Sequence, residues 1–167
     1  MCNTVNISSL GNIFLSVLIG FSSISLAQNL TVFDPQTHYD EADGLYDPSY
    51  LRHLHIDFED AAFHSILGES FFANPSLRIP ATVTFDGIVL DSVGVRYKGN
   101  STFCLPHEQG SVKVPYNLDM NYWIPGQKLM EYNKVKLANA WLDPTYCKEY
   151  MASRIYRKYL PTPEVNL

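Results

Sequence analysis

Residues 78–98, RIPATVTFDGIVLDSVGVRYK, carry the clearest secondary-structure pattern of the chain. Asp86-Gly87 near its middle is a strong type I′ turn pair, because both central positions of that turn need a positive φ. Apolar and polar residues alternate on each side of the turn, which is typical of strands with one buried face. The sequence therefore predicts a β-hairpin, with Arg96 and Lys98 facing outward and a buried face formed by Ile79, Ala81, Val83, Phe85, Val93, Val95 and Tyr97.

Further elements lie on both sides of this hairpin. Alternation predicts strands at 51–58, 111–120 and 134–139, and Pro115 gives the second of these a free edge because proline cannot donate a ladder bond. A short helical period follows the first strand at 62–67. Asp143 as N-cap and Pro144 at the first helical position predict a helix that ends near Tyr159-Leu160. We expect an α+β domain, a twisted antiparallel sheet against which this helix packs through Cys147, Met151, Ile155 and Tyr159.

The N-terminal segment resembles an export signal. Residues 13–27, IFLSVLIGFSSISLA, carry no charge and end in the small-x-small pattern Ser25-Leu26-Ala27. We expect cleavage after Ala27, an irregular lead-in at 28–50 and a domain at 51–167. The product is then secreted or held at the cell surface, without a membrane segment. No basic residue precedes the apolar run, so an uncleaved anchor is the alternative.

The amino-acid composition restricts the classes of protein to which the chain can belong. The formal net charge of −5 argues against nonspecific nucleic-acid binding, and aromatic residues make up 13% of the chain, which favours a folded domain. Cleavage leaves two cysteines, Cys104 and Cys147. In an exported protein such a pair is expected to form a disulfide, with two separate buried thiols as the alternative. Their spacing matches no metal-chelating loop, so no metal site is predicted at this pair.

Five segments occur in an order that resembles a known family: ATVTFDG, VGVRYKGNST, KVPYNLDM, KVKLANAWLD and CKEYMASRIY. Together they are similar to the N-terminal part of the CotH (spore coat protein H) family of secreted protein-kinase-like enzymes, over about residues 58–167. The resemblance implies the N-terminal lobe of an atypical kinase-like fold. It also implies that the complete protein uses ATP and a divalent metal, Mg²⁺ or Mn²⁺, to phosphorylate Ser or Thr of extracellular or surface proteins.

The chain departs from the family pattern in two ways. Only Lys113 is kept of the basic positions in the family's Lys-rich strand. In kinase-like folds the catalytic and metal-binding aspartates follow the N-terminal lobe, and nothing in this chain takes those roles by position. We therefore assign no catalytic residue and expect a missing C-terminal lobe as partner. The alternative is a non-catalytic surface-assembly or binding module on the same scaffold.

The resemblance also implies a nucleotide site. Its parts are the loop Lys98, Gly99, Asn100 and Ser101 over the phosphates, Lys113 as the strand lysine that pairs with them, and Glu149 as the helix acid that orients this lysine. The residues alone favour a plain turn at Gly99-Asn100 and a solvated lysine at Lys113, and they leave Glu149 open between a surface residue and one that faces a cleft. Three further side chains, His53, His55 and Asp57, share one strand face and form either a metal site or an exposed polar surface.

Overall fold

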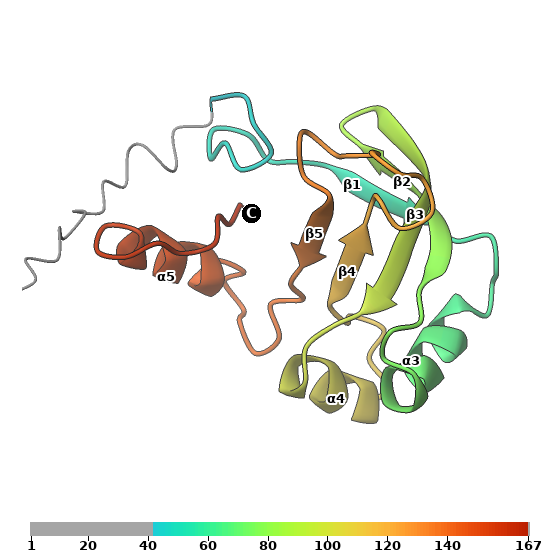
Figure 1. Cartoon of the computed structure of the whole chain (residues 1–167). Coiled ribbons are helices and arrows are strands. Elements are labelled where there is room, and N and C mark those ends of the chain that lie inside the picture. The colour runs from blue at the N-terminus through green and yellow to red at the C-terminus, as the bar shows by residue number, and fades with distance from the viewer. Residues whose placement is uncertain (1–41, 167) are drawn as a thin grey trace, which may run out of the picture. The chain divides into compact units, whose positions relative to one another are not determined.

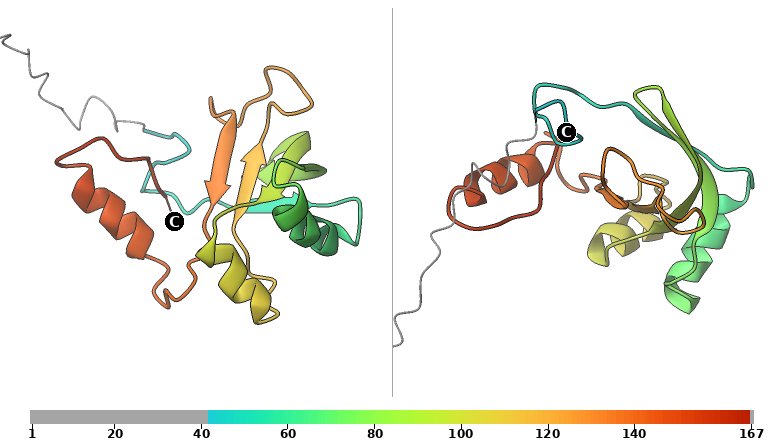
Figure 2. Two further views of the ribbon diagram at one scale, coloured as in Figure 1. Left: turned by 60° about the horizontal axis from the view of Figure 1, so that its bottom comes forward. Right: turned by 45° about the horizontal axis from the view of Figure 1, so that its top comes forward.

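The computed structural model describes residues 42–166, so the expected signal at 1–27 and part of the lead-in lie outside it. The described elements are β1 (Leu54–Asp57), α3 (Phe63–Ala73), β2 (Ile79–Phe85), β3 (Ile88–Tyr97), α4 (Ser101–Glu108), β4 (Tyr116–Asp119), β5 (Lys134–Leu137) and α5 (Lys148–Tyr156) (Figure 1). The strands form one antiparallel sheet in the order β1-β2-β3-β4-β5, which confirms the α+β class. The sheet is strongly curled (Figure 2). Among residues 42–166, no helix has the length and apolarity to cross a membrane.

The predicted hairpin is confirmed. Asp86 and Gly87 connect β2 to β3 with φ values of 44° and 88°, as a type I′ turn requires. Val83, Val93 and Val95 are fully buried, so the alternation correctly identified the core face. The register runs from Phe85 opposite Ile88 to Ile79 opposite Val95, with an irregularity between Ala81 and Val83.

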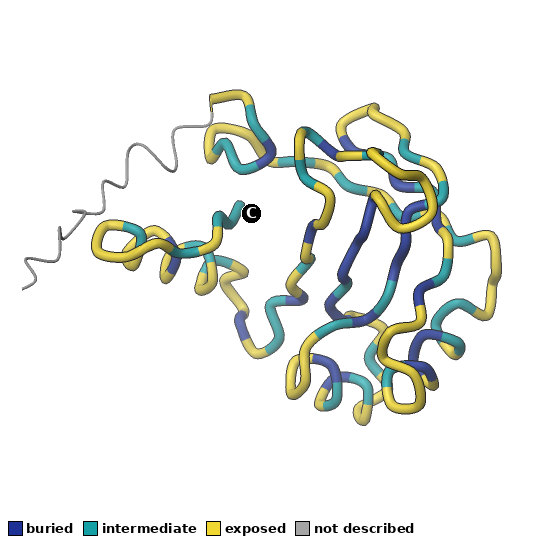
Figure 3. Tube along the Cα trace, viewed as in Figure 1, coloured by how far each residue is buried: buried dark blue, intermediate teal, exposed yellow. Residues whose placement is uncertain are grey.

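Helices α3 and α4 cover the apolar face of the sheet. Phe103 of α4 is fully buried, and its ring lies 4.0 Å from Phe71 of α3 and 5.2 Å from Tyr97 of β3. His64 of α3 also bonds through Nδ1 to the Tyr97 hydroxyl. Figure 3 shows that buried positions concentrate in the central strands and the inner sides of these two helices. The core therefore combines this aromatic cluster with buried aliphatic side chains of the sheet, among them Val83, Val93, Val95 and Leu118.

Two predicted elements around α4 were wrong. The sequence predicted a loop and then a long strand at 111–120, whereas residues 101–108 are helical and the strand is limited to Tyr116–Asp119. Pro115 lacks the N–H of a ladder bond, and the Val114 N–H bonds to the Val112 carbonyl in a tight local turn. Val112 is consequently exposed, although its place in the alternation predicted burial.

The C-terminal helix begins four residues later than predicted, and its apolar stripe is not buried. Helix α5 begins at Lys148, because the Asp143 side chain instead closes a turn by accepting bonds from the Thr145 and Lys148 backbone N–H groups. Met151, Ile155 and Tyr159 are 54%, 55% and 75% exposed. In both views of Figure 2, α5 stands clear of the sheet.

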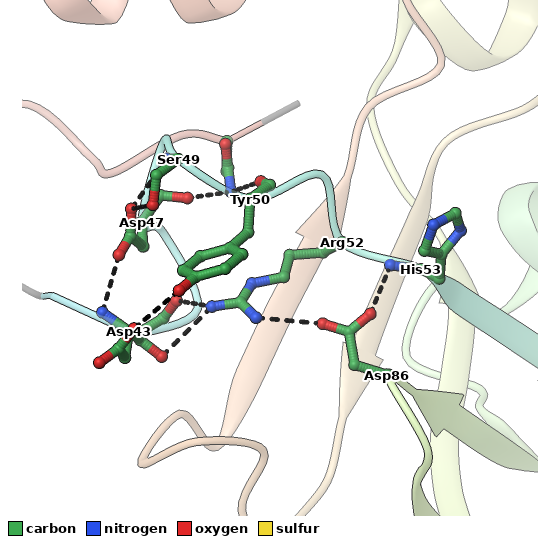
Figure 4. Close-up of polar contacts among 9 residues, drawn as sticks. Asp43, Asp47, Ser49, Tyr50, Arg52, His53 and Asp86 are labelled. Atoms are coloured by element: carbon green, nitrogen blue, oxygen red, sulfur yellow. Dashed lines mark hydrogen bonds and ion pairs between the residues drawn. The ribbon is translucent and has the colours of Figure 1, made fainter.

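The segment before β1 is held by Arg52, as Figure 4 shows. Its guanidinium donates to the carbonyls of Asp43 and Gly44 and forms a 3.2 Å ion pair with Asp86 at the hairpin turn. The Asp86 carboxylate also accepts a bond from the His53 backbone N–H, and this bond holds the pKa of Asp86 below its ordinary value. The Asn166 side-chain amide donates to the carbonyls of Asp47 and Tyr50. These polar contacts fix the entry to β1.

Candidate functional site

The predicted phosphate loop forms the junction between β3 and α4. Lys98 extends β3 by one bond, from its backbone N–H to the Pro115 carbonyl at 3.1 Å. Gly99 and Asn100 make the turn, and Ser101 is the first residue of α4. The stretch is thus a strand end and a helix N-terminus, whereas the sequence suggested a loop between two strands. A helix N-terminus presents unbonded N–H groups and the positive end of the helix dipole.

Gly99 is required by its backbone and by its surroundings. Its φ is +87°, and a Cβ atom at this position would lie 2.2 Å from the Thr102 hydroxyl oxygen. Any other side chain would have to displace Thr102 from the first turn of α4. Gly99 therefore has a structural role at this turn, whether or not the turn binds an anion.

Lys113 does not lie on a strand, which corrects the predicted position. It is in the irregular segment before β4, exposed, with its ammonium 4.1 Å from the centre of the Tyr146 ring. This is a cation–π contact. Tyr146 was not among the predicted site residues, and it adopts a positive φ of 61° in the turn that Asp143 closes.

Asn139 connects the two predicted halves of the site. Its side-chain amide donates to the Thr102 carbonyl at 2.9 Å and to the Lys113 carbonyl at 3.0 Å. Asn139 is 5% exposed, so both bonds are shielded from water. The amide therefore fixes the Lys113 segment beside the first turn of α4. Sequence analysis missed this role, although Asn139 lies within KVKLANAWLD, one of the segments that resemble CotH proteins.

Glu149 is not part of this arrangement. It lies in the first turn of α5 and is exposed, and it forms no ion pair with Lys113 in the described structure. The acid that the resemblance pairs with the strand lysine is therefore separate from it here. Cys104 and Cys147 are both half-buried free thiols, so the structure does not show the expected disulfide, and that pairing stays a prediction.

A second polar cluster lies on the opposite face of the sheet. The Arg78 guanidinium donates to the carbonyls of Gly94 and Asn117 and to the Asn117 side chain, and lies 3.8 Å from the Asp119 carboxylate. Asp119 also pairs with Lys134 at 3.2 Å. Burial lowers the pKa of Arg78, and the Asp119 charge opposes that shift. Because Arg78, Asn117 and Asp119 bond to one another, this network stabilises the face.

The polar face of β1 is exposed. His55 and Asp57 contact each other at 3.0 Å, with side chains that are 73% and 62% accessible. The His53 backbone is bonded to Asp86. Among residues 42–166 there is no group of three or more His, Cys, Asp or Glu side chains that could hold a metal ion. The three side chains therefore form an exposed polar strand surface.

Comparisons with known proteins add no identification to this geometry. The fold and the hydrogen bonds of Asn139 are described from the structure of this chain alone. The resemblance to CotH proteins is based on the five sequence segments. No family model, no curated protein and no solved structure matches the chain.

Proposed function

We propose that the chain is the N-terminal lobe of a secreted CotH-like protein kinase and contributes half of its ATP site. In the complete protein, a second lobe would bring the catalytic and metal-binding aspartates, and the γ-phosphoryl of ATP would pass to Ser or Thr of an extracellular or surface protein. The observation that carries the proposal is the Asn139 amide, which holds the Lys113 segment beside the N-terminus of α4. Both elements come from segments that resemble the family.

The chemistry of the half-site suits a polyphosphate. Free N–H groups at the start of α4 and the Ser101 hydroxyl can donate to phosphate oxygens, and the helix dipole favours negative charge there. Lys113 adds a flexible cation once its ammonium leaves the Tyr146 ring. The described residues include no carboxylate cluster for Mg²⁺ or Mn²⁺. A metal would neutralise phosphate charge in the complete protein, and we assign its ligands to the second lobe.

Binding of ATP to the full chain tests the site. Because a single lobe leaves one side of the nucleotide open to solvent, we expect weak binding, with a Kd on the order of 1 mM. Titration with Mg-ATP should shift the amide resonances of residues 99–102 in ¹H–¹⁵N spectra. Lys113→Ala should weaken binding by roughly tenfold, the effect of one charge-assisted hydrogen bond. Ser101→Ala should weaken it less.

The control is Lys136→Ala, which removes an exposed lysine from β5 and changes the net charge equally. It should bind ATP like the parent. Equal binding by the Lys113 and Lys136 variants, or shifts spread evenly over the surface lysines, would show that residues 98–101 form only a turn. The chain alone should also transfer no phosphate to a Ser-rich acceptor, because the base and metal ligands belong to the second lobe. Mutation-sensitive incorporation would contradict that assignment.

The exposed stripe of α5 favours a second candidate function. Met151, Ile155 and Tyr159 present apolar surface that no described residue covers. Such surface suits a non-catalytic assembly module as well as a lobe interface. A Lys113→Ala variant that lost ATP binding but kept surface assembly in cells would separate the two functions.

A further inference from the structure

A groove of about 440 Å³ lies between β1 and the apolar face of β4 and β5. Its apolar wall consists of Leu54, Ile56, Phe58, Phe63, Tyr116 and Leu137. Phe58 and Phe63 stack at 4.1 Å, and Phe58 lies 6.5 Å from Tyr116, so the wall is largely aromatic. The nucleotide proposal uses none of these residues.

One side of the groove is the free edge of β1. Within the described chain β1 pairs only with β2. The backbone N–H and carbonyl of His53 both form hydrogen bonds with Asp86, which lies on the β2 side of β1. Backbone groups alternate along an antiparallel strand, so His55 and Asp57 also turn theirs to β2, and Leu54 and Ile56 present theirs at the free edge. The side chains of Leu54 and Ile56 line the groove beside these groups.

The free edge of β1 and the apolar groove beside it together favour an extended peptide as the ligand. A strand added at the edge would bond with the backbone of Leu54 and Ile56, and every second side chain of that strand would enter the groove. A helix has no free backbone groups along its length and could not make those bonds. The groove therefore requires apolar residues at alternate positions of the peptide.

The rim of the groove is acidic at one end. Asp57, Glu59 and Asp60 lie at the end of β1 and just after it, all exposed, and no Lys or Arg occurs between 53 and 77. The stretch also contains three histidines, His53, His55 and His64, of which His55 contacts Asp57. A Lys or Arg of the peptide next to this end would therefore be favoured.

We propose that this groove binds an extended segment of a partner protein, which adds a strand to the free edge of β1. The segment carries apolar side chains at alternate positions and a basic residue that faces Asp57. The proposal is independent of the nucleotide site, because a module without any ATP affinity could bind such a segment.

The test uses the full chain and a capped heptapeptide of alternating Ile and Thr with a Lys at each end. Hydrogen–deuterium exchange should show the Leu54 and Ile56 amides exchanging quickly alone and roughly tenfold or more slowly at saturating peptide. The same peptide with N-methyl groups on the amides that face β1 should give no protection. Protection elsewhere, or none at Leu54 and Ile56, overturns the proposal.

Charge reversal on the rim supplies a matched pair of variants. Asp57→Lys should weaken binding of the Lys peptide about tenfold and strengthen binding of a peptide with Glu in place of Lys. Glu69→Lys, an equal charge change on the exposed side of α3, should leave both affinities unchanged. Equal effects of the two variants would overturn the rim assignment. A dimer by sedimentation, with Leu54 and Ile56 protected in the absence of peptide, would instead assign the edge to a second copy.

Discussion

The β2–β3 hairpin and helix α5 carry equally regular apolar patterns, but the structure treats them in opposite ways. Val83, Val93 and Val95 of the hairpin are fully buried, whereas Met151 and Ile155 of α5 are more than half exposed. The hairpin has α3 and α4 to cover it, and the described chain offers α5 no such cover. Periodicity therefore identifies which face of an element is apolar. Whether that face is buried depends on a partner that the pattern cannot reveal.

Two side-chain truncations test this contrast between a covered and an uncovered apolar face. Phe103→Ala removes a fully buried ring at the centre of the aromatic cluster and should cost roughly 3–5 kcal/mol of the free energy of unfolding. Ile155→Ala removes a half-exposed side chain and should cost about 0.5 kcal/mol or less. Urea denaturation measures both. A cost above about 2 kcal/mol for Ile155→Ala would mean that α5 is packed after all.

The predicted disulfide would link α5 covalently to α4, one of the two helices that cover the hairpin. Cys104 lies on α4 and Cys147 directly precedes α5. In the chain-entropy model, closing this loop should stabilise the fold by about 4 kcal/mol. Thiol titration of the unfolded, non-reduced protein in a Cys2→Ser background should find no free thiol. Two free thiols would show that the cysteines are separate, as in the structure.

Substitution at Gly99 tests how tightly the β3–α4 turn is built. Gly99→Ala should destabilise by about 1–3 kcal/mol, because the residue has a positive φ and its Cβ would clash with Thr102. Thr102→Ala in the same chain should recover part of the loss. Gly110→Ala is the control for φ alone, since its φ is +71° with open space around the Cβ position. Equal costs at the two glycines would remove the clash from the explanation.

The smallest expected effect concerns acid and the start of α5. Hydrogen bonds from the Thr145 hydroxyl and from the Lys148 and Thr145 backbone lower the pKa of Asp143. The unfolded-state pKa of an aspartate is about 3.9, so this contribution to stability is complete above that pH and is lost as the pH falls through the lower folded-state value. Helical circular dichroism should therefore decrease slightly between about pH 4 and 2. Asp143→Ala should remove that acid-dependent component, and an unchanged profile would contradict this role of the Asp143 carboxylate.

The hairpin could be predicted because each half repeats a two-residue period and Asp86-Gly87 admits one kind of turn. Helix α4 could not, because Pro106 lies inside it and only Phe103 and Pro106 are buried, which gives no helical period. The alternation from Val112 to Met120 imitates a strand, but Pro115 interrupts the ladder. In the candidate site, Gly99 and Lys113 were found from the segments they occupy. Asn139 was missed because a single sequence does not show that an asparagine after a strand is buried and bonded twice.

The hydrogen bonds of Asn139 to Thr102 and Lys113 have a consequence for the order in which the domain folds. Its two bonds reach Thr102 and Lys113, which lie 37 and 26 residues earlier in the chain, whereas the β2–β3 hairpin closes through a two-residue turn. Contacts that close long loops are entropically expensive early in folding, so the hairpin should form before the Asn139 bonds do. Asn139→Ala should then accelerate unfolding several-fold in stopped-flow experiments and leave the refolding rate nearly unchanged. Asn139 would thus prolong the lifetime of the native state without changing how fast that state forms.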